Sequence, residues 1–236
     1  MGTIKQGILG GFSGKVGTVV GSTWKAVHYM RALAVNINNP RTEKQQNQRS
    51  KFAVTINFAK TMTPFLRFGY KEYSGQQTTF NAAVSYVLKH ALKGSGTNVS
   101  IDYNKALVTR GSLMPAMDAT VTVSGNKAVF AWTDNSGMGD AALTDAAMLL
   151  AYNKDKGMAV YDIAAATRSD AKAELKLPAN WSDDALAIYL GFCNENATNV
   201  ANSVCLQDTP VSGDSEGGGS EDSGSGSGGV DENPLG

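Results

Sequence analysis

The pattern of apolar and polar positions changes along the chain, and each change predicts a different kind of element. Near the N-terminus, KVGTVVG alternates with a period of two, with Val16, Thr18 and Val20 on one face. A second extended run, AVHYMRALAV, follows after Trp24-Lys25. Two extended runs around a short turn are typical of a β-hairpin. Residues 1–35 are therefore expected to form a Gly-rich β-hairpin arm.

Residues 36–94 have the period of a helix instead. Asn39-Pro40 is a start signal, because Asn caps the first N–H groups and Pro needs none at the first helical position. The first helix is almost wholly polar in its first half, so that half is expected to face solvent or a partner. A short second helix, PFLRF, is predicted before Gly69, and a third from about Thr79 to Leu92. The third helix carries an apolar stripe of Phe80, Val84, Val87, Leu88 and Leu92.

From residue 118 onward, short apolar runs alternate with turn signals. The predicted strands are 119–123, 127–133, 146–153, 158–163, 171–177, 185–193 and 200–206. Seven short strands at this spacing are typical of an antiparallel β-sandwich. The expected sandwich covers residues 118–208 and follows a linker at 95–117, in which KALVT has the pattern of one short strand.

The remaining residues, 209–236, are rich in Gly and Ser. From residue 211 they include six acidic residues, no basic residue and few apolar ones. Such a segment cannot bury enough apolar surface to offset the entropy lost on ordering. The sequence thus predicts an α+β fold with a β-hairpin arm, a helical segment, an antiparallel sandwich and a disordered acidic tail.

Charge is divided unevenly between the two halves of the chain, although the 236 residues have a formal net charge of zero. Residues 1–110 carry ten Lys, five Arg and three acidic residues, a net charge of +12. Residues 111–236 carry six basic and 18 acidic residues, a net charge of −12. A division of this size indicates two surfaces that bind different partners, or two surfaces that bind each other.

The basic half mixes cationic side chains with aromatic and amide side chains. This mixture suits phosphates and stacked bases, and it equally complements an acidic protein surface. We select as interaction candidates Lys15, Trp24, Lys25, Arg31, Arg41, Lys44, Arg49 and Lys51. Protein contact is the expectation, and nucleic-acid binding is the alternative.

No catalytic, metal or cofactor site is predicted. GGFSGKVG is similar to a phosphate-binding loop, with glycines followed by a lysine. That motif, however, needs Gly at position 9 and Ser or Thr at position 16, where the chain has Leu9 and Val16. The two histidines, His28 and His90, have no metal-ligand spacing or nucleophile motif beside them. We therefore expect a protein that is not an enzyme and binds no cofactor.

The acidic pairs and the cysteines have structural interpretations. Asp183-Asp184 and the pair Asp140 and Asp145 are expected to form turns and stay solvated, and no EF-hand spacing supports a calcium site. Cys193 and Cys205 fall on the last two predicted strands. Two free thiols are expected there, with a cross-strand disulfide as the alternative.

Targeting signals are not evident. The N-terminus MGTIKQGILGGF lacks the apolar run of a secretory signal peptide, and no stretch approaches the roughly 18 apolar residues of a membrane span. We expect synthesis in the cytoplasm, followed by release in a virion or another particle.

Residues 11–53 contain a dense motif, S-G-K-x-G-x-V-V-G-x-x-W, followed by Arg31 and by N-P-x-T-x-x-Q-x-x-Q-R-x-K-F. This region resembles a protein family of unknown function from Bacteroides-type gut bacteria and their phages, and the resemblance extends to about residue 207. Ala26 stands where the family pattern has Gly. The resemblance implies relatives but no activity.

The C-terminal part separately resembles a fibronectin type III or immunoglobulin-like domain. Trp132 lies on the second predicted strand, and Leu177-Pro178 precedes Tyr189 in the manner of a tyrosine corner. Such sandwiches are usually adhesive or structural, so the resemblance implies an interaction domain.

Together these features favour a non-enzymatic structural or assembly protein. The Gly-rich arm would add a strand to the sheet edge of a neighbour, and the basic half of one copy would contact the acidic half of the next. The expected partners are a second copy of this chain or another structural protein, in a homo-oligomer or a phage or extracellular particle that displays the sandwich. A nucleic-acid-binding protein that uses residues 1–110 is the alternative.

Overall fold

The computed structural model describes residues 2–4, 10–24, 27–34, 41–94, 96 and 98–208. The chain divides into two compact units, Met1–Gln46 and Asn47–Gly236. The fold is mixed and mostly β, as predicted. The expected helix start at Asn39-Pro40, the candidate Lys25 and the acidic tail lie outside the described residues.

The first unit contains a four-stranded antiparallel sheet rather than a single hairpin. Its strands lie in chain order: β1 (Thr3–Ile4), β2 (Phe12–Val16), β3 (Val19–Trp24) and β4 (Val27–Ala32). The prediction that KVGTVVG is one alternating run is wrong, because Val16 pairs with Val19 across a two-residue turn. Gly17 makes this turn with a positive φ of 56°, a conformation that costs glycine little.

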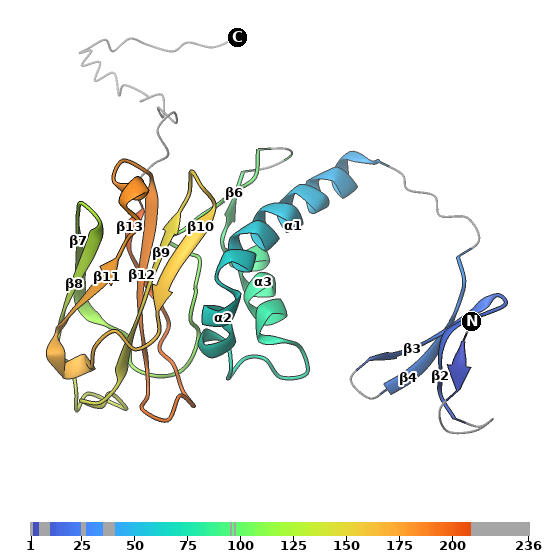
Figure 1. Ribbon diagram of the computed structural model, residues 1–236, viewed down its shortest axis with the longest axis horizontal. Coiled ribbons are helices and arrows are strands. Elements are labelled where there is room, and N and C mark those ends of the chain that lie inside the picture. The colour runs from blue at the N-terminus through green and yellow to red at the C-terminus, as the bar shows by residue number, and fades with distance from the viewer. Residues whose placement is uncertain are drawn as a thin grey trace, which may run out of the picture. The chain divides into compact units, whose positions relative to one another are not determined.

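The described residues of the second unit contain most of the first helix, two further α-helices, two sheets of a sandwich and a short strand pair (Figure 1). The helices are α1 (Glu43–Thr61), α2 (Thr63–Gly69) and α3 (Thr79–His90). The short pair is β5 (Leu92–Lys93) with β6 (Ser100–Ile101). The sandwich strands are β7 (Met117–Ser124), β8 (Lys127–Thr133), β9 (Ala146–Asn153), β10 (Met158–Asp162), β11 (Lys172–Lys176), β12 (Leu186–Cys193) and β13 (Val204–Asp208).

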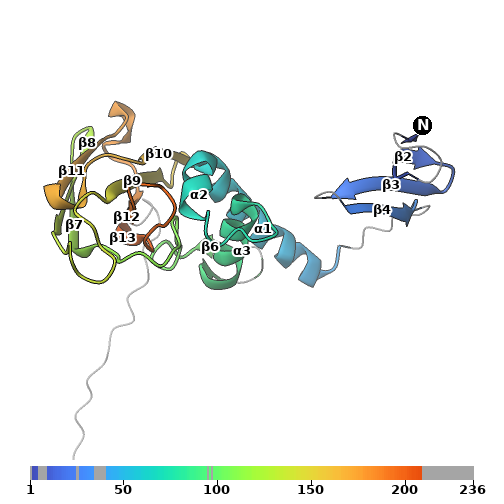
Figure 2. The same ribbon diagram turned by 90° about the horizontal axis from the view of Figure 1, so that it is seen from below.

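These elements form three layers, which both ribbon views show (Figures 1 and 2). An outer sheet has the strand order β11-β8-β7, and a middle sheet has the order β10-β9-β12-β13. The helices cover the other face of the middle sheet. The two central strands of the middle sheet, β9 and β12, are almost entirely buried. A strand that is covered on both faces needs apolar residues at successive positions, which explains the unbroken runs AMLLAY and LAIYLGFC.

Successive side chains of β9 therefore enter two different cores. Ala147, Leu149 and Ala151 face the outer sheet. They form one core with side chains of β8 that include Phe130 and Trp132. The alternate residues of the strand, Met148, Leu150 and Tyr152, pack against the helices.

Aromatic contacts fasten the helices to the middle sheet. Phe58 of α1 meets Tyr152 of β9 edge-on, with 4.9 Å between the ring centroids. Phe65 of α2 lies 5.6 Å from Tyr161 of β10. Because such pairs add to the free energy of apolar burial, the helices and the sandwich form one packed body.

Helix boundaries follow local chemistry. The side chain of Thr78 caps α3 and accepts a hydrogen bond from the Asn81 N–H at 3.2 Å. The helix ends at His90, two residues before the predicted end, and Leu92 belongs to β5. Pro64 lies in the first turn of α2, where the missing N–H of proline removes no helical hydrogen bond.

Residues 95–117 differ from the predicted linker, because most of the described part is packed. Its buried residues are Val99, Ile101, Ala106, Val108, Thr109, Gly111 and Leu113. The Ser203 hydroxyl accepts hydrogen bonds from the N–H groups of Val108 and Thr109, at 2.9 and 3.3 Å. The KALVT segment is not a strand. The Asp102 carbonyl accepts hydrogen bonds from the N–H groups of Lys105 and Ala106, so turn contacts and the Ser203 side chain, rather than a β-ladder, satisfy its backbone N–H groups.

Candidate interaction surface

The register of the N-terminal sheet brings several predicted residues onto one face. Lys15 pairs with Val20, and Val20 pairs with Arg31, so the three side chains form a row across the sheet. Side chains two positions apart along a strand share this face. We call it the basic face, and it carries Lys15, Val20, Ser22, Trp24, Val27, Tyr29 and Arg31.

Large apolar side chains are exposed on the basic face. The exposed fractions are 59% for Trp24, 65% for Val27 and 44% for Tyr29. Lys15 and Arg31 are also exposed, and the first acidic residue of the chain is Glu43. A concentration of exposed aromatic and basic groups without acidic neighbours is typical of a surface that binds another molecule.

The opposite face of this sheet is partly packed on itself. The Phe12 ring lies over Gly21, where an added Cβ would come within 2.6 Å of the ring. The Nδ1 atom of His28 is hydrogen-bonded to Thr23 Oγ1 at 2.8 Å, and the His28 ring lies against Gly11. His28 thus has local structural contacts.

The other predicted interaction residues lie elsewhere. Arg41 precedes α1, and its carbonyl oxygen accepts a hydrogen bond from the Gln46 side chain at 3.2 Å. Lys44 and Arg49 are exposed on the first half of α1, and Lys51 is half-buried there. The structure therefore groups Lys15, Trp24 and Arg31 on the sheet.

A groove of about 540 Å³ lies between α1 and α3 in the second unit. Its lining is Gln48, Phe52, Ile56, Asn81, Val84, Ser85, Leu88 and Lys89. Phe52 remains half exposed at this groove. The polar first half of α1 therefore ends at Phe52, an apolar side chain that solvent can reach at the groove.

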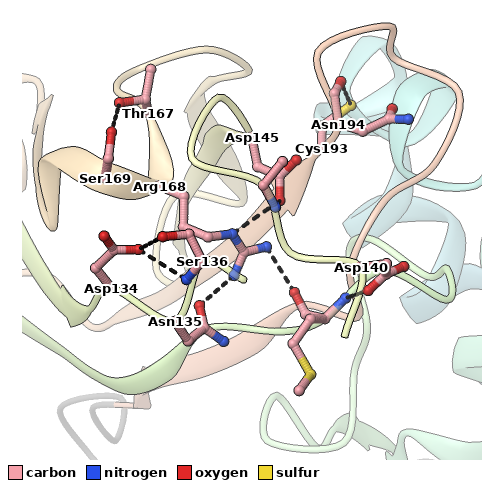
Figure 3. Close-up of polar contacts among 12 residues, drawn as sticks. Asp134, Asn135, Ser136, Asp140, Asp145, Thr167, Arg168, Ser169, Cys193 and Asn194 are labelled. Carbon is pink, nitrogen blue, oxygen red and sulfur yellow. Dashed lines mark hydrogen bonds and ion pairs between the residues drawn. The ribbon is translucent and has the colours of Figure 1, made fainter. Parts of the chain in front are cut away.

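The sandwich contains a buried ion pair that the sequence analysis missed. Arg168 and Asp145 are both almost fully buried, and the Nε–H of Arg168 donates to Asp145 Oδ2 at 3.0 Å (Figure 3). Asp145 is therefore not the solvated turn residue that we expected. The sequence did contain one sign of this pair. Arg168 is the only Arg among residues 111–236, and Arg is better suited than Lys to a buried ion pair.

The remaining donors of Arg168 join separate loops at one end of the sandwich. Its terminal nitrogens donate to Asn135 Oδ1 at 2.6 Å and to the Met114 carbonyl at 2.9 Å. The guanidinium carbon lies 3.9 Å from the centre of the Phe192 ring. The role of this network is structural, because every group that it contacts belongs to the core or to a loop.

A family model matches residues 11–207, from just before β2 of the N-terminal sheet to the last sandwich strand. The chain belongs to DUF6266, a family of unknown function. The predicted membership of a family of unknown function is therefore confirmed. No curated protein and no solved structure matches the chain. The match includes both units, so the basic face and the three-layer unit belong to one family pattern.

The tyrosine corner expected in this DUF6266 chain does not form. The Tyr189 hydroxyl donates to the carbonyl oxygen of Tyr103 at 2.9 Å, a residue 86 positions upstream. A tyrosine corner bonds to backbone only a few residues away. Tyr189 instead ties the middle sheet to the segment that precedes the sandwich. Trp132 is buried as expected, edge-on to Phe192.

The cysteines of the DUF6266 chain form no disulfide. Cys193 faces Ala146 across one ladder, whereas Cys205 faces Tyr189 across another. Burial and the charge of Asp145 raise the pKa of the Cys193 thiol, which favours its neutral form.

The described part of the DUF6266 chain contains neither a metal-binding cluster nor a membrane-spanning helix. No group of three or more His, Cys, Asp and Glu side chains gathers there in an arrangement that suits a metal ion. None of the helices described above has the length and apolar character needed to cross a bilayer.

Proposed function

We propose that this protein is a non-enzymatic structural protein that assembles through the basic face of its N-terminal sheet. The exposure of Trp24, Val27 and Tyr29 carries the proposal. Apolar side chains of this size favour burial, and an aromatic side chain at the centre of a contact is a frequent source of binding energy. A sheet face that leaves them exposed is suited to a partner.

The charge distribution supports an acidic partner surface. Lys15 and Arg31 lie in one row of the basic face, and residues 111–236 carry a net charge of −12. Contact between the basic face of one copy and the acidic half of another would be heterologous, and such contacts build rings or fibres. We propose a homo-oligomer, or a phage or extracellular particle, as the product of this assembly.

We infer a fibronectin type III-like topology for the sandwich. When the seven strands are lettered A, B, C, C′, E, F and G in chain order, the sheets read A-B-E and C′-C-F-G. In constant-type immunoglobulin domains the fourth strand joins the A-B-E sheet, whereas here the fourth strand, C′, pairs with strand C of the other sheet. Here the helices cover one face of the C′-C-F-G sheet, so the sandwich offers its outer sheet and its loops to partners.

The test is light scattering of the full chain after size exclusion, across a salt series. We expect oligomers at low salt that dissociate as salt screens the charges. Trp24→Ser should weaken association about 10-fold or more. Met30→Ser is the matched control, because Met30 is 71% exposed on the opposite face of the same sheet, and it should leave association unchanged. A chain that stays monomeric at low salt from nanomolar to millimolar concentration would exclude self-assembly.

Nucleic-acid binding is the second candidate, and the basic face supports it as well. Two cations beside Trp24 and Tyr29 on one sheet face resemble the platforms that stack bases and neutralise phosphates. Trp132 and Trp181 are buried, so quenching of the exposed Trp24 would report binding of a single-stranded oligonucleotide. We expect affinity to fall steeply with salt. Absence of quenching and of complex formation at about 50 mM salt would eliminate this candidate.

A further inference from the structure

A second, smaller pocket lies on the side of α3 that faces the α2–α3 connection. Its volume is about 280 Å³. The lining is Tyr73, Gln77, Ala82, Ser85, Tyr86, Lys89, His90 and Arg110. Three of these side chains are basic and none is acidic. Pockets that enclose drug-sized ligands have volumes of about 300–1,000 Å³, so this pocket suits a small ligand.

Arg110 is held in place by stacking rather than by an ion pair. Its guanidinium carbon lies 4.2 Å from the centre of the Tyr73 ring and 5.1 Å from that of Tyr86. The Arg110 backbone N–H also donates to the Gly69 carbonyl at 2.7 Å. Among the described residues, no carboxylate forms an ion pair with Arg110. These contacts hold the guanidinium against the two rings, and no described residue accepts a hydrogen bond from it, so its N–H groups are available to a ligand.

The neighbouring donors come from one side of α3. Ser85 and Lys89 are four residues apart and thus lie one above the other on the helix. The His90 ring lies against the Tyr86 ring at a tilt of 39°, with 4.8 Å between the centroids. Tyr86 therefore positions both Arg110 and His90. The backbone N–H of Gln77 donates to the Ser74 carbonyl at 2.8 Å, which fixes the backbone of Gln77 beside the pocket that it lines.

We propose that this pocket binds a phosphate group, either free phosphate or a small phosphate ester. A guanidinium with free in-plane donors binds a phosphate through two parallel hydrogen bonds. An ammonium, a hydroxyl and an amide nearby supply donors for the remaining phosphate oxygens. A carboxylate has fewer oxygens and a smaller charge, so it would leave part of this donor set unused.

The proposal does not depend on assembly through the N-terminal sheet. Every lining residue belongs to the second unit. A monomeric protein that binds phosphate would contradict the assembly proposal and support this one. An oligomer without a phosphate site would do the reverse.

The experiment is isothermal titration calorimetry of the full chain with inorganic phosphate, and then with glycerol phosphate, at constant ionic strength. We expect saturable binding of phosphate with a dissociation constant of about 1 mM or tighter. Acetate should bind at least about 10-fold more weakly. Tighter binding of the ester than of free phosphate would assign an ester as the ligand, and the reverse would assign free phosphate. Equal binding of acetate and phosphate, or no saturable heat with phosphate, would overturn the proposal.

Variants test the named residues. Arg110→Met and Gln77→Glu should each reduce phosphate affinity at least about 10-fold, the first by removing the bidentate donor and the second by adding a competing carboxylate. Gln77 is exposed, so its variant tests the site even where Arg110→Met fails to fold. Lys93→Met is the control, since it removes one charge from the exposed position of β5, outside the pocket lining. Undiminished binding in Gln77→Glu, or an equal loss in Lys93→Met, would contradict the assignment.

Discussion

Arg168 places a full positive charge inside the sandwich, where Asp145 balances it. Arg168→Met leaves the Asp145 carboxylate buried without its partner, so we expect the free energy of unfolding to fall by about 3–5 kcal/mol. Urea denaturation measures this. Lys127→Met is the matched control, because it breaks an exposed pair with Glu174 and should cost less than about 1 kcal/mol.

The double variant Arg168→Met, Asp145→Leu separates charge from packing. It removes both charges, so it should be more stable than Arg168→Met alone. A double variant whose loss equals the sum of the losses of Arg168→Met and Asp145→Leu would show that the two side chains do not stabilise each other.

Tyr70 links stability to alkaline pH. Its hydroxyl is buried and donates to the Leu107 carbonyl at 2.8 Å, and burial raises the pKa of Tyr70. Above about pH 10 the unfolded chain releases this proton while the folded chain retains it, so stability falls as pH rises. We expect Tyr70→Phe to lose about 1 kcal/mol at pH 7.

The same variant should unfold with a weaker pH dependence between pH 9 and 11, measured by urea denaturation. Burial also raises the pKa of Tyr152, so some alkaline dependence should persist. An unchanged slope in Tyr70→Phe would contradict the assignment to this residue.

At the scale of elements, the middle sheet depends on the helices that cover it. Met148, Leu150 and Tyr152 face α1–α3 and would be exposed without them. We therefore expect residues 41–208 to unfold in one cooperative transition, and residues 118–208 alone to aggregate. Thermal unfolding by circular dichroism and light scattering distinguish these outcomes. A monomeric fragment 118–208 with a cooperative transition would show that the sandwich is independent.

Element prediction worked where local periodicity and tertiary environment agreed. β8 and β9 have the predicted bounds, and α2 ends at Gly69 as expected. The prediction of a single strand through Gly17 failed. A two-residue turn can interrupt an alternating run while the residue pattern stays the same. Element prediction also failed at β13, which begins at Val204, because Val200 and Ala201 form only isolated bridges.

At the scale of the whole molecule, the acidic tail balances the charge of the remaining chain. Deletion of residues 209–236 removes six acidic and no basic residues, so the net charge changes from zero to +6. We expect the isoelectric point to rise above 6.7 and retention on a cation exchanger to increase. The thermal midpoint should be unchanged, because both described cores end before residue 209. A lower midpoint would mean that the tail contributes to folding.

The sequence by itself determined the helices, most strands, the charge division and the family. These depend on local periodicity, on composition or on a contiguous motif, which a single chain displays directly. Only the tertiary structure decided that Lys15, Trp24 and Arg31 share a face, since strand register sets this. It also decided that Arg168 meets Asp145, 23 residues away, and that Arg110 stacks on Tyr86. Such contacts depend on how distant segments pair, and no local pattern specifies that pairing.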